Sequence, residues 1–94
     1  MINIQNYING TFQNPISDNW IDNYNPSDGS VYGKIPNSSM DDIEHAYQSA
    51  KSAFKLWSHT TLEERSRIFI KISELLEDNL QRFAEAESKD NGKP

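Results

Sequence analysis

The stretch IPNSSMDDIEHAYQSAKSAFKLW (residues 35–57) decides the fold, because the spacing of its apolar residues changes from that of a strand to that of a helix. After Ser39 the apolar residues recur at steps of three and four, which is the period of an amphipathic α-helix. Ser39 and Asp42 have the spacing of a capping box, with Asp in place of Glu. The pattern predicts a helix over residues 39–57, whose apolar stripe comprises Ile43, Ala46, Tyr47, Ala50, Ala53, Phe54 and Trp57.

Residues 1–38 are predicted to form two short β-hairpins and loops. In NYINGTF (6–12), the dipeptide Asn9-Gly10 lies between Tyr7-Ile8 and Thr11-Phe12 and favours a tight hairpin turn. Farther along, WIDNYN and SVYGKIP flank the sequence PSDG (26–29), in which proline and glycine are typical turn residues. Strands this short and polar are not stable alone.

Residues 61–91 continue the helical pattern, as either one kinked helix or two abutting helices. Thr61 and Glu64 form a second capping box. The pair Asp78-Asn79 makes a polar break, and Asp78 with Gln81 could cap a further helix. The apolar face comprises Ile68, Phe69, Ile72, Leu75 and Leu76, followed by Leu80, Phe83 and Ala84.

The final stretch AESKDNGKP (86–94) contains the signals that end a helix. Gly92 can adopt the left-handed conformation of a helix C-terminus, and Pro94 prevents continuation. No element follows in the sequence, and the hairpins offer little apolar area to cover the helical stripes. We therefore expect these residues to be the beginning of a longer polypeptide that supplies the missing partner surface.

Composition excludes several classes of protein. The 94 residues suffice for one small domain at most, and the hydrophobic share of 35% with a mean hydropathy of -0.80 argues against a large core. A net charge of -5 argues against binding to nucleic acid or to an anionic membrane. The sequence has no cysteine, hence no disulfide and no thiol nucleophile. It also lacks a signal peptide and a long apolar segment, so we expect a cytoplasmic protein.

The polar residues form no recognisable active site. His45 and His59 lack metal-ligand spacing, and we interpret both as solvated. Glu63-Glu64 lies in a helix first turn, where acids interact favourably with the helix dipole. Gly92-Lys93 lacks the preceding glycine of a phosphate-binding loop, because Glu87 stands there. We predict no catalytic and no cofactor-binding residue in this chain.

The order of short motifs nevertheless indicates a family. NPSDG, AKSAFKLW, ERSRI and DNGKP are weak individually, but they occur in order and without gaps over essentially the whole chain. Together they resemble the N-terminal portion of the aldehyde dehydrogenase superfamily, and most of all its semialdehyde dehydrogenases of aromatic-ring and tryptophan breakdown. The resemblance implies an α/β parent enzyme, with residues 1–94 as the N-terminal fragment of its nucleotide-binding domain region.

The resemblance also implies the chemistry of that parent. It would be a homo-oligomer that oxidises an aldehyde to a carboxylate with NAD or NADP, and its catalytic and dinucleotide-binding residues would lie beyond residue 94. The fragment itself would bind no cofactor and would serve as scaffolding. The alternative, from another class, is a stand-alone helical module whose exposed stripes bind a protein partner.

One site can be carried over from the family. Some members bind a monovalent cation through backbone carbonyls just before the NP turn and the aspartate of the DNGK motif. The matching residues are Asn23, Tyr24 and Asp90, and carboxylate and carbonyl oxygens are suitable ligands for a hard cation. A further ligand would come from sequence beyond residue 94. The alternative is that Asp90 caps the helix end or accepts a backbone N–H.

Overall fold

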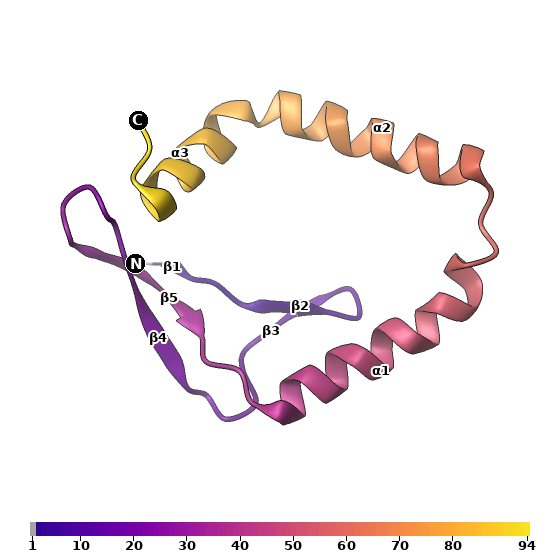
Figure 1. Cartoon of the computed structure of the whole chain (residues 1–94), viewed down its shortest axis with the longest axis horizontal. Helices are drawn as coiled ribbons and strands as arrows, with labels where there is room; N and C mark the ends of the chain where they lie inside the picture. The colour runs from indigo at the N-terminus through magenta and orange to yellow at the C-terminus, as the bar shows by residue number, and fades with distance from the viewer. Residues whose placement is uncertain (1) are drawn as a thin grey trace.

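A computed structural model describes residues 2–94, and within them it contains five strands followed by three helices (Figure 1). The predicted arrangement of short hairpins before helices is confirmed. The elements are β1 (Ile2–Asn3), β2 (Asn6–Ile8), β3 (Thr11–Gln13), β4 (Trp20–Tyr24), β5 (Val31–Pro36), α1 (Met40–Trp57), α2 (Leu62–Asp78) and α3 (Leu80–Asn91).

Both predicted hairpins form. Strands β2 and β3 pair antiparallel around Asn9-Gly10, whose φ angles of 53° and 78° are those of a left-handed two-residue turn. Strands β4 and β5 also pair antiparallel. Their connection closes where the Gly29 backbone N–H donates to the Asn25 carbonyl at 2.7 Å. Proline and glycine therefore act in this turn as the sequence predicts.

A third strand joins the second hairpin, and the sequence did not predict it. Strand β1 pairs parallel to β5, so that the sheet has the order β1-β5-β4. Gly33 lies opposite Ile2, and a Cβ atom at this position would collide with the Ile2 carbonyl oxygen. The absence of a side chain at Gly33 is therefore what lets the two backbones pair. A two-residue strand is too short to show an alternating pattern.

The helix boundaries follow from specific capping residues. The Ser39 backbone N–H donates to the Asp42 carboxylate at 2.9 Å, and the Glu64 N–H donates to the Thr61 hydroxyl at 3.1 Å. The predicted polar break separates α2 from α3, so the helical segment consists of two abutting helices. Asp78 is the last residue of α2, and Asn79 rather than Asp78 precedes α3. The Asn79 side-chain amide donates to the Leu75 carbonyl at 2.8 Å, and the same carbonyl accepts from the Asn79 backbone N–H at 3.1 Å.

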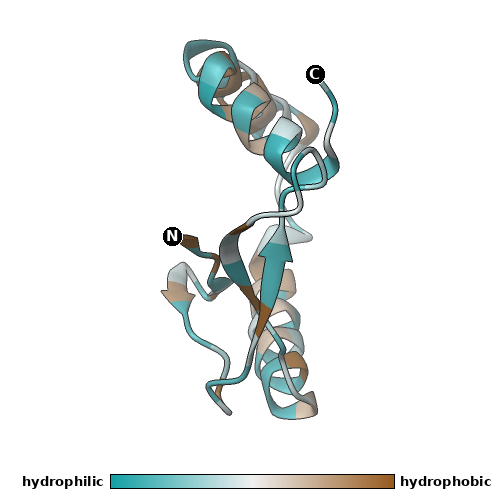
Figure 2. Ribbon diagram, turned by 90° about the vertical axis from the view of Figure 1, so that its left-hand side faces the viewer, coloured by the Kyte–Doolittle hydropathy of each residue, from teal (hydrophilic) through white to brown (hydrophobic). Residues whose placement is uncertain are grey.

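The molecule is thin and open, with extents of 47 × 35 × 16 Å. The helices form an arc that leaves the sheet with α1 and returns to it with α3 (Figure 1). Among the described residues only two apolar side chains, those of Ile8 and Pro15, are buried, and apolar residues occur on strands and helices alike (Figure 2). The helical stripes are therefore largely exposed. Nowhere in residues 2–94 is a helix long and apolar enough to cross a membrane.

Candidate functional site

Three polar side chains connect the end of α3 to the sheet. The Asn23 amide of β4 donates to the Tyr32 hydroxyl oxygen of β5 at 2.8 Å and to Asp90 Oδ1 of α3 at 3.3 Å. The Tyr32 hydroxyl donates to the same Asp90 oxygen at 3.2 Å. We call Asn23, Tyr32 and Asp90 the polar triangle. It joins residues up to 67 positions apart in the sequence.

The triangle brings together two of the three predicted cation-site residues. Asn23 and Asp90 are hydrogen-bonded, and Tyr24 follows Asn23 directly in β4, with its side chain exposed. The pairing of β4 with β5 is irregular between Asn23 and Tyr24. Such an irregularity interrupts the ladder of backbone hydrogen bonds. The two backbone carbonyls of the predicted site therefore belong to an irregular segment of the strand.

The alternative interpretation of Asp90 needs a correction. Within residues 2–94, the hydrogen bonds of the Asp90 carboxylate go to the side chains of Asn23 and Tyr32, and none goes to a backbone N–H. The end of α3 is capped instead by Gly92, which has the left-handed conformation and whose N–H donates to the Ser88 carbonyl at 2.8 Å. Asp90 thus joins α3 to the sheet. The expectation of a local cap was wrong because the sequence alone does not show that α3 returns to β4 and β5.

Tyr32 has an altered acidity in this arrangement. Partial burial raises the pKa of the Tyr32 hydroxyl, and the hydrogen bond to Asp90 and the charge of that carboxylate raise it further. The hydroxyl therefore stays protonated and remains a donor to Asp90 at neutral pH. In the triangle, two neutral groups, the Asn23 amide and the Tyr32 hydroxyl, therefore donate to one oxygen of the Asp90 carboxylate.

A cleft of about 990 Å³ lies beside the triangle, between the sheet and α3. Its walls combine apolar and charged side chains, and its lining includes Ile2, Ile4, Gly33, Leu76, Arg82 and Phe83. Ile4 and Phe83 are 47% and 53% exposed, so the apolar walls are not closed by any described residue. The cleft is a candidate surface for packing, because it lacks an activated nucleophile or a paired acid and base.

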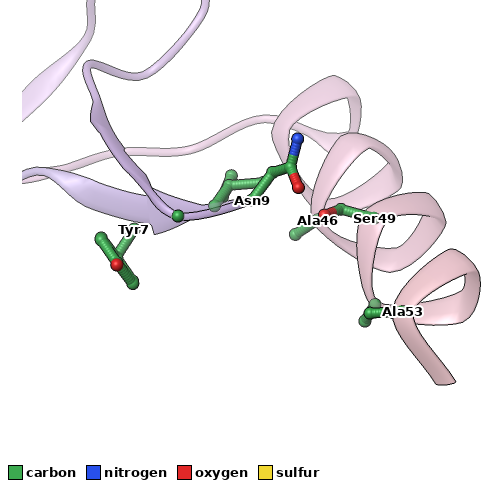
Figure 3. Close-up of a pocket in the computed structure, with 8 residues that line it drawn as sticks. Tyr7, Asn9, Ala46, Ser49 and Ala53 are labelled. Carbon is green, nitrogen blue, oxygen red and sulfur yellow. The ribbon is translucent and has the colours of Figure 1, made fainter. Parts of the chain in front are cut away.

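A second, smaller hollow of about 490 Å³ lies between the tip of the β2–β3 hairpin and α1. Figure 3 shows the Asn9 side chain extending from the hairpin toward the part of α1 that carries Ala46 and Ser49. Tyr7 is on the same hairpin and packs on Phe12 of the opposite strand with ring centroids 4.9 Å apart. Small side chains on α1 allow the hairpin to approach the helix.

The remaining polar residues singled out in the sequence either cap a helix, pair with a neighbouring side chain or are exposed. Glu64 completes the capping box with Thr61, and Glu63 forms an exposed ion pair with Arg67 at 3.6 Å. His59 Nδ1 lies 2.8 Å from the Lys55 carbonyl oxygen at the end of α1, and His45 is exposed. Within residues 2–94 no three His, Asp or Glu side chains are close enough together to hold a metal ion.

Asp42 has a second function that the sequence did not reveal. Besides capping α1, its carboxylate accepts from the Ile16 backbone N–H at 2.9 Å. The side chain is only 4% exposed. The backbone hydrogen bonds from Ile16 and Ser39 lower the pKa of the Asp42 carboxyl. Only the capping-box spacing pointed to this residue, because nothing in the sequence places Ile16 next to α1.

The chain belongs to the aldehyde dehydrogenase family. Residues 12–94 match the model of that family, so the resemblance seen in the short motifs is confirmed.

Individual relatives support the same assignment. The chain is 46% identical to 2-aminomuconic semialdehyde dehydrogenase of Homo sapiens over 99% of its own length, and 39% identical to an aldehyde dehydrogenase of Deinococcus radiodurans over 95%. A crystal structure of PnpE in complex with nicotinamide adenine dinucleotide superimposes on 96% of the chain with a TM-score of 0.92 and 33% identity. The fold is therefore that of the N-terminal part of such enzymes.

The matched region is a small part of each relative. The chain spans 19% of the human protein, 17% of the Deinococcus protein and 18% of the PnpE chain. Most of each relative therefore has no counterpart in these 94 residues, and its activity as a whole protein does not transfer directly.

Proposed function

We propose that residues 1–94 are the N-terminal structural part of an NAD(P)-dependent aldehyde dehydrogenase that oxidises an aldehyde to a carboxylate. The match to the family over residues 12–94 carries this proposal. The human relative is named for a semialdehyde, which favours a semialdehyde as the substrate. The PnpE structure contains nicotinamide adenine dinucleotide, which favours a nicotinamide cofactor as the hydride acceptor. A homo-oligomeric state and a cytoplasmic location remain predictions.

The residues of this chain do not fit a nicotinamide site. The sequence has no glycine-rich phosphate-binding loop, and its four glycines lie at turns, at a helix end and in the β1–β5 pairing. It has no cysteine to form a covalent adduct with an aldehyde. We therefore place neither cofactor nor substrate on residues 1–94, and we assign them a scaffolding role.

The scaffolding role explains the exposed apolar faces. Helices of this length gain most of their stability from packing, yet apolar residues of α2 such as Ile68, Ile72 and Leu76 remain 44–45% exposed. In a larger enzyme these faces would be covered by its other parts. The same exposure also favours the alternative, a helical module that binds a separate protein partner.

The polar triangle is the proposed position of the cation site. Asp90 and the backbone carbonyls of Asn23 and Tyr24 would hold a monovalent cation in the full-length enzyme, and the proximity of Asn23 to Asp90 supports this assignment. A bound cation would neutralise the carboxylate and strengthen the connection between α3 and the sheet. If so, Asp90→Ala in the full-length enzyme lowers the melting temperature mainly in potassium or sodium salts, because the ion binds only the folded state.

An activity assay tests the scaffolding role. We expect the purified 94-residue chain to produce no NADH or NADPH with a panel of aldehydes that includes semialdehydes. Turnover that persists after removal of host enzymes would overturn the proposal.

Sequencing the gene beyond the codon for Pro94 distinguishes the enzyme from the interaction module. A reading frame that continues into a glycine-rich segment and a cysteine supports the enzyme, whereas an immediate stop codon supports the interaction module.

A further inference from the structure

Asparagine followed by glycine occurs twice in this chain, at Asn9-Gly10 and at Asn91-Gly92. In this dipeptide the glycine backbone nitrogen can attack the asparagine side-chain amide, because no side chain on glycine hinders the approach. The other asparagines precede serine, proline or larger residues. The chain thus contains two chemically equivalent sites for intramolecular deamidation in different structural surroundings.

The surroundings of Asn9 leave the reacting groups free. Asn9 is exposed at the tip of the β2–β3 hairpin, and within residues 2–94 neither its side chain nor the Gly10 N–H takes part in a hydrogen bond. The space at Gly10 is open, since a Cβ atom placed there meets no other atom within 4 Å. The hairpin has only two short strands, and such hairpins are marginally stable in water. Local opening of the turn is therefore easy.

The surroundings of Asn91 hold the same groups in place. The Gly92 N–H donates to the Ser88 carbonyl at 2.8 Å, so the attacking nitrogen is engaged. The Asn91 side chain accepts from the Lys93 N–H at 2.9 Å and donates to Glu87 at 3.4 Å. A Cβ atom at Gly92 would lie 3.1 Å from Pro26 Cβ, so this turn is packed against the connection between β4 and β5. Ring closure at Asn91 requires all of these contacts to break.

We propose that Asn9 is a site of spontaneous deamidation and that the fold protects Asn91. The Gly10 nitrogen loses its proton and forms a bond to the Asn9 side-chain carbonyl carbon. The bond from that carbon to the amide nitrogen breaks, and ammonia leaves with the proton. Water then opens the cyclic imide at either carbonyl, which yields aspartate or isoaspartate. Nothing is oxidised or reduced, and water is the only co-reactant.

The product changes the hairpin and its contact with α1. Isoaspartate adds a methylene group to the main chain, so the two-residue turn no longer matches the twist of β2 and β3. Both products place a carboxylate in the hollow beside Ala46 and Ser49. Ile8, one of two buried apolar side chains among the described residues, lies next to the modified turn. We expect deamidation of Asn9 to loosen the packing of the hairpin on α1.

The test compares the two sites within one molecule. The purified chain is incubated at mildly alkaline pH, and aspartate and isoaspartate at residues 9 and 91 are quantified by peptide mapping with mass spectrometry. We expect conversion at Asn9 to be several-fold faster than at Asn91 in the native chain. In concentrated urea the two rates should converge, because both dipeptides are then unfolded.

Two outcomes overturn the proposal. One is conversion at Asn91 that equals or exceeds conversion at Asn9 in the native chain, and the other is a several-fold difference that persists in urea. The Asn9→Gln variant is the matched control, since its longer side chain disfavours ring closure. It should lose conversion at residue 9 and keep the native rate at residue 91. If this variant does not fold, the comparison within the unaltered chain still decides.

Discussion

Two carboxylates, Asp42 and Asp90, connect the helical half of the molecule to the sheet half, and these two junctions are built differently. At the start of α1, the buried Asp42 carboxylate accepts backbone N–H groups from Ile16 and Ser39. At the end of α3, the donors to the exposed Asp90 carboxylate among the described residues are the side chains of Asn23 and Tyr32. Backbone donors can move only if the main chain moves, so the junction at Asp42 is rigid. Side-chain donors can change rotamer, so the junction at Asp90 can rearrange.

The difference has a functional meaning. The α1 junction forms between segments 26 residues apart and is complete within this chain. The α3 junction lies beside an open cleft and contains the residues proposed to hold a cation. We infer that α1 stays fixed on the loop that carries Ile16, while the position of α3 depends on what the proposed full-length enzyme or an ion adds.

The largest expected effect comes from breaking the α1 junction. Asp42→Ala removes a buried carboxylate and leaves the part-buried Ile16 and Ser39 N–H groups without their acceptor, and unpaired donors shielded from water are costly. We expect a melting temperature lower by several degrees, measured by circular dichroism. Asp41→Ala, which removes an exposed acid in the same helical turn, is the control and should change little. Equal effects of the two substitutions would contradict a special role of Asp42.

Acid should weaken the same junction. The folded-state pKa of Asp42 lies below its ordinary value because of the Ile16 and Ser39 hydrogen bonds. A carboxyl with a depressed pKa contributes stability above its unfolded pKa of about 3.9, and this contribution is lost as pH falls through the lower folded value. We expect the parent to lose stability over this acid range. Asp42→Asn should be less stable at neutral pH and less sensitive to acid, as read from urea melts at several pH values.

The α3 junction also has a backbone component at Gly92, with a smaller expected effect. Gly92 has a φ of 78° and lies against Pro26, so Gly92→Ala combines left-handed strain with a close contact. The strain alone costs about 1–2 kcal/mol. Gly29→Ala is the control, because Gly29 has a φ of 75° and open space around it. Urea unfolding should show a greater loss for Gly92→Ala, and equal losses would mean that the Pro26 contact adds nothing.

The parts of the fold that the sequence predicted are those that depend on neighbouring residues. Asn9-Gly10 determines a turn by itself, and Thr61 with Glu64 determines a helix start within four residues. The parts that were missed depend on residues distant in the sequence. The β1–β5 pairing brings Ile2 to Gly33, and the polar triangle brings Asp90 to strands 58 and 67 residues earlier.

The candidate site shows the same division. The family resemblance pointed to Asn23, Tyr24 and Asp90, and the structure brings Asn23 and Asp90 together. Tyr32 carries no motif and was not singled out, although it donates a hydrogen bond to Asp90. Its place opposite β4 becomes visible only when the register of β4 and β5 is known, with Asn23 paired to Gly33.

The smallest expected effect concerns Asp90. Its Oδ1 atom already accepts from Asn23 and Tyr32, and the further cation ligand is expected from outside residues 1–94. In the 94-residue chain, Asp90→Ala should therefore cost about 1 kcal/mol for lost hydrogen bonding, and the cost should be the same in every salt. The measurement is a melting series of parent and variant in potassium, sodium and tetramethylammonium chlorides at one ionic strength.

The salt series separates hydrogen bonding from ion binding at this junction. Tyr32→Phe removes one donor to Asp90 but keeps the carboxylate, so it serves as the matched variant. If the triangle acts only through hydrogen bonds, the melting temperature of each variant differs from that of the parent by the same amount in all three salts. A difference in melting temperature for Asp90→Ala that widens in potassium or sodium, without a parallel change for Tyr32→Phe, would show that the carboxylate binds the ion with no ligand from outside residues 1–94. The α3 junction would then be complete within this chain, as the α1 junction is, and the contrast between the two would fail.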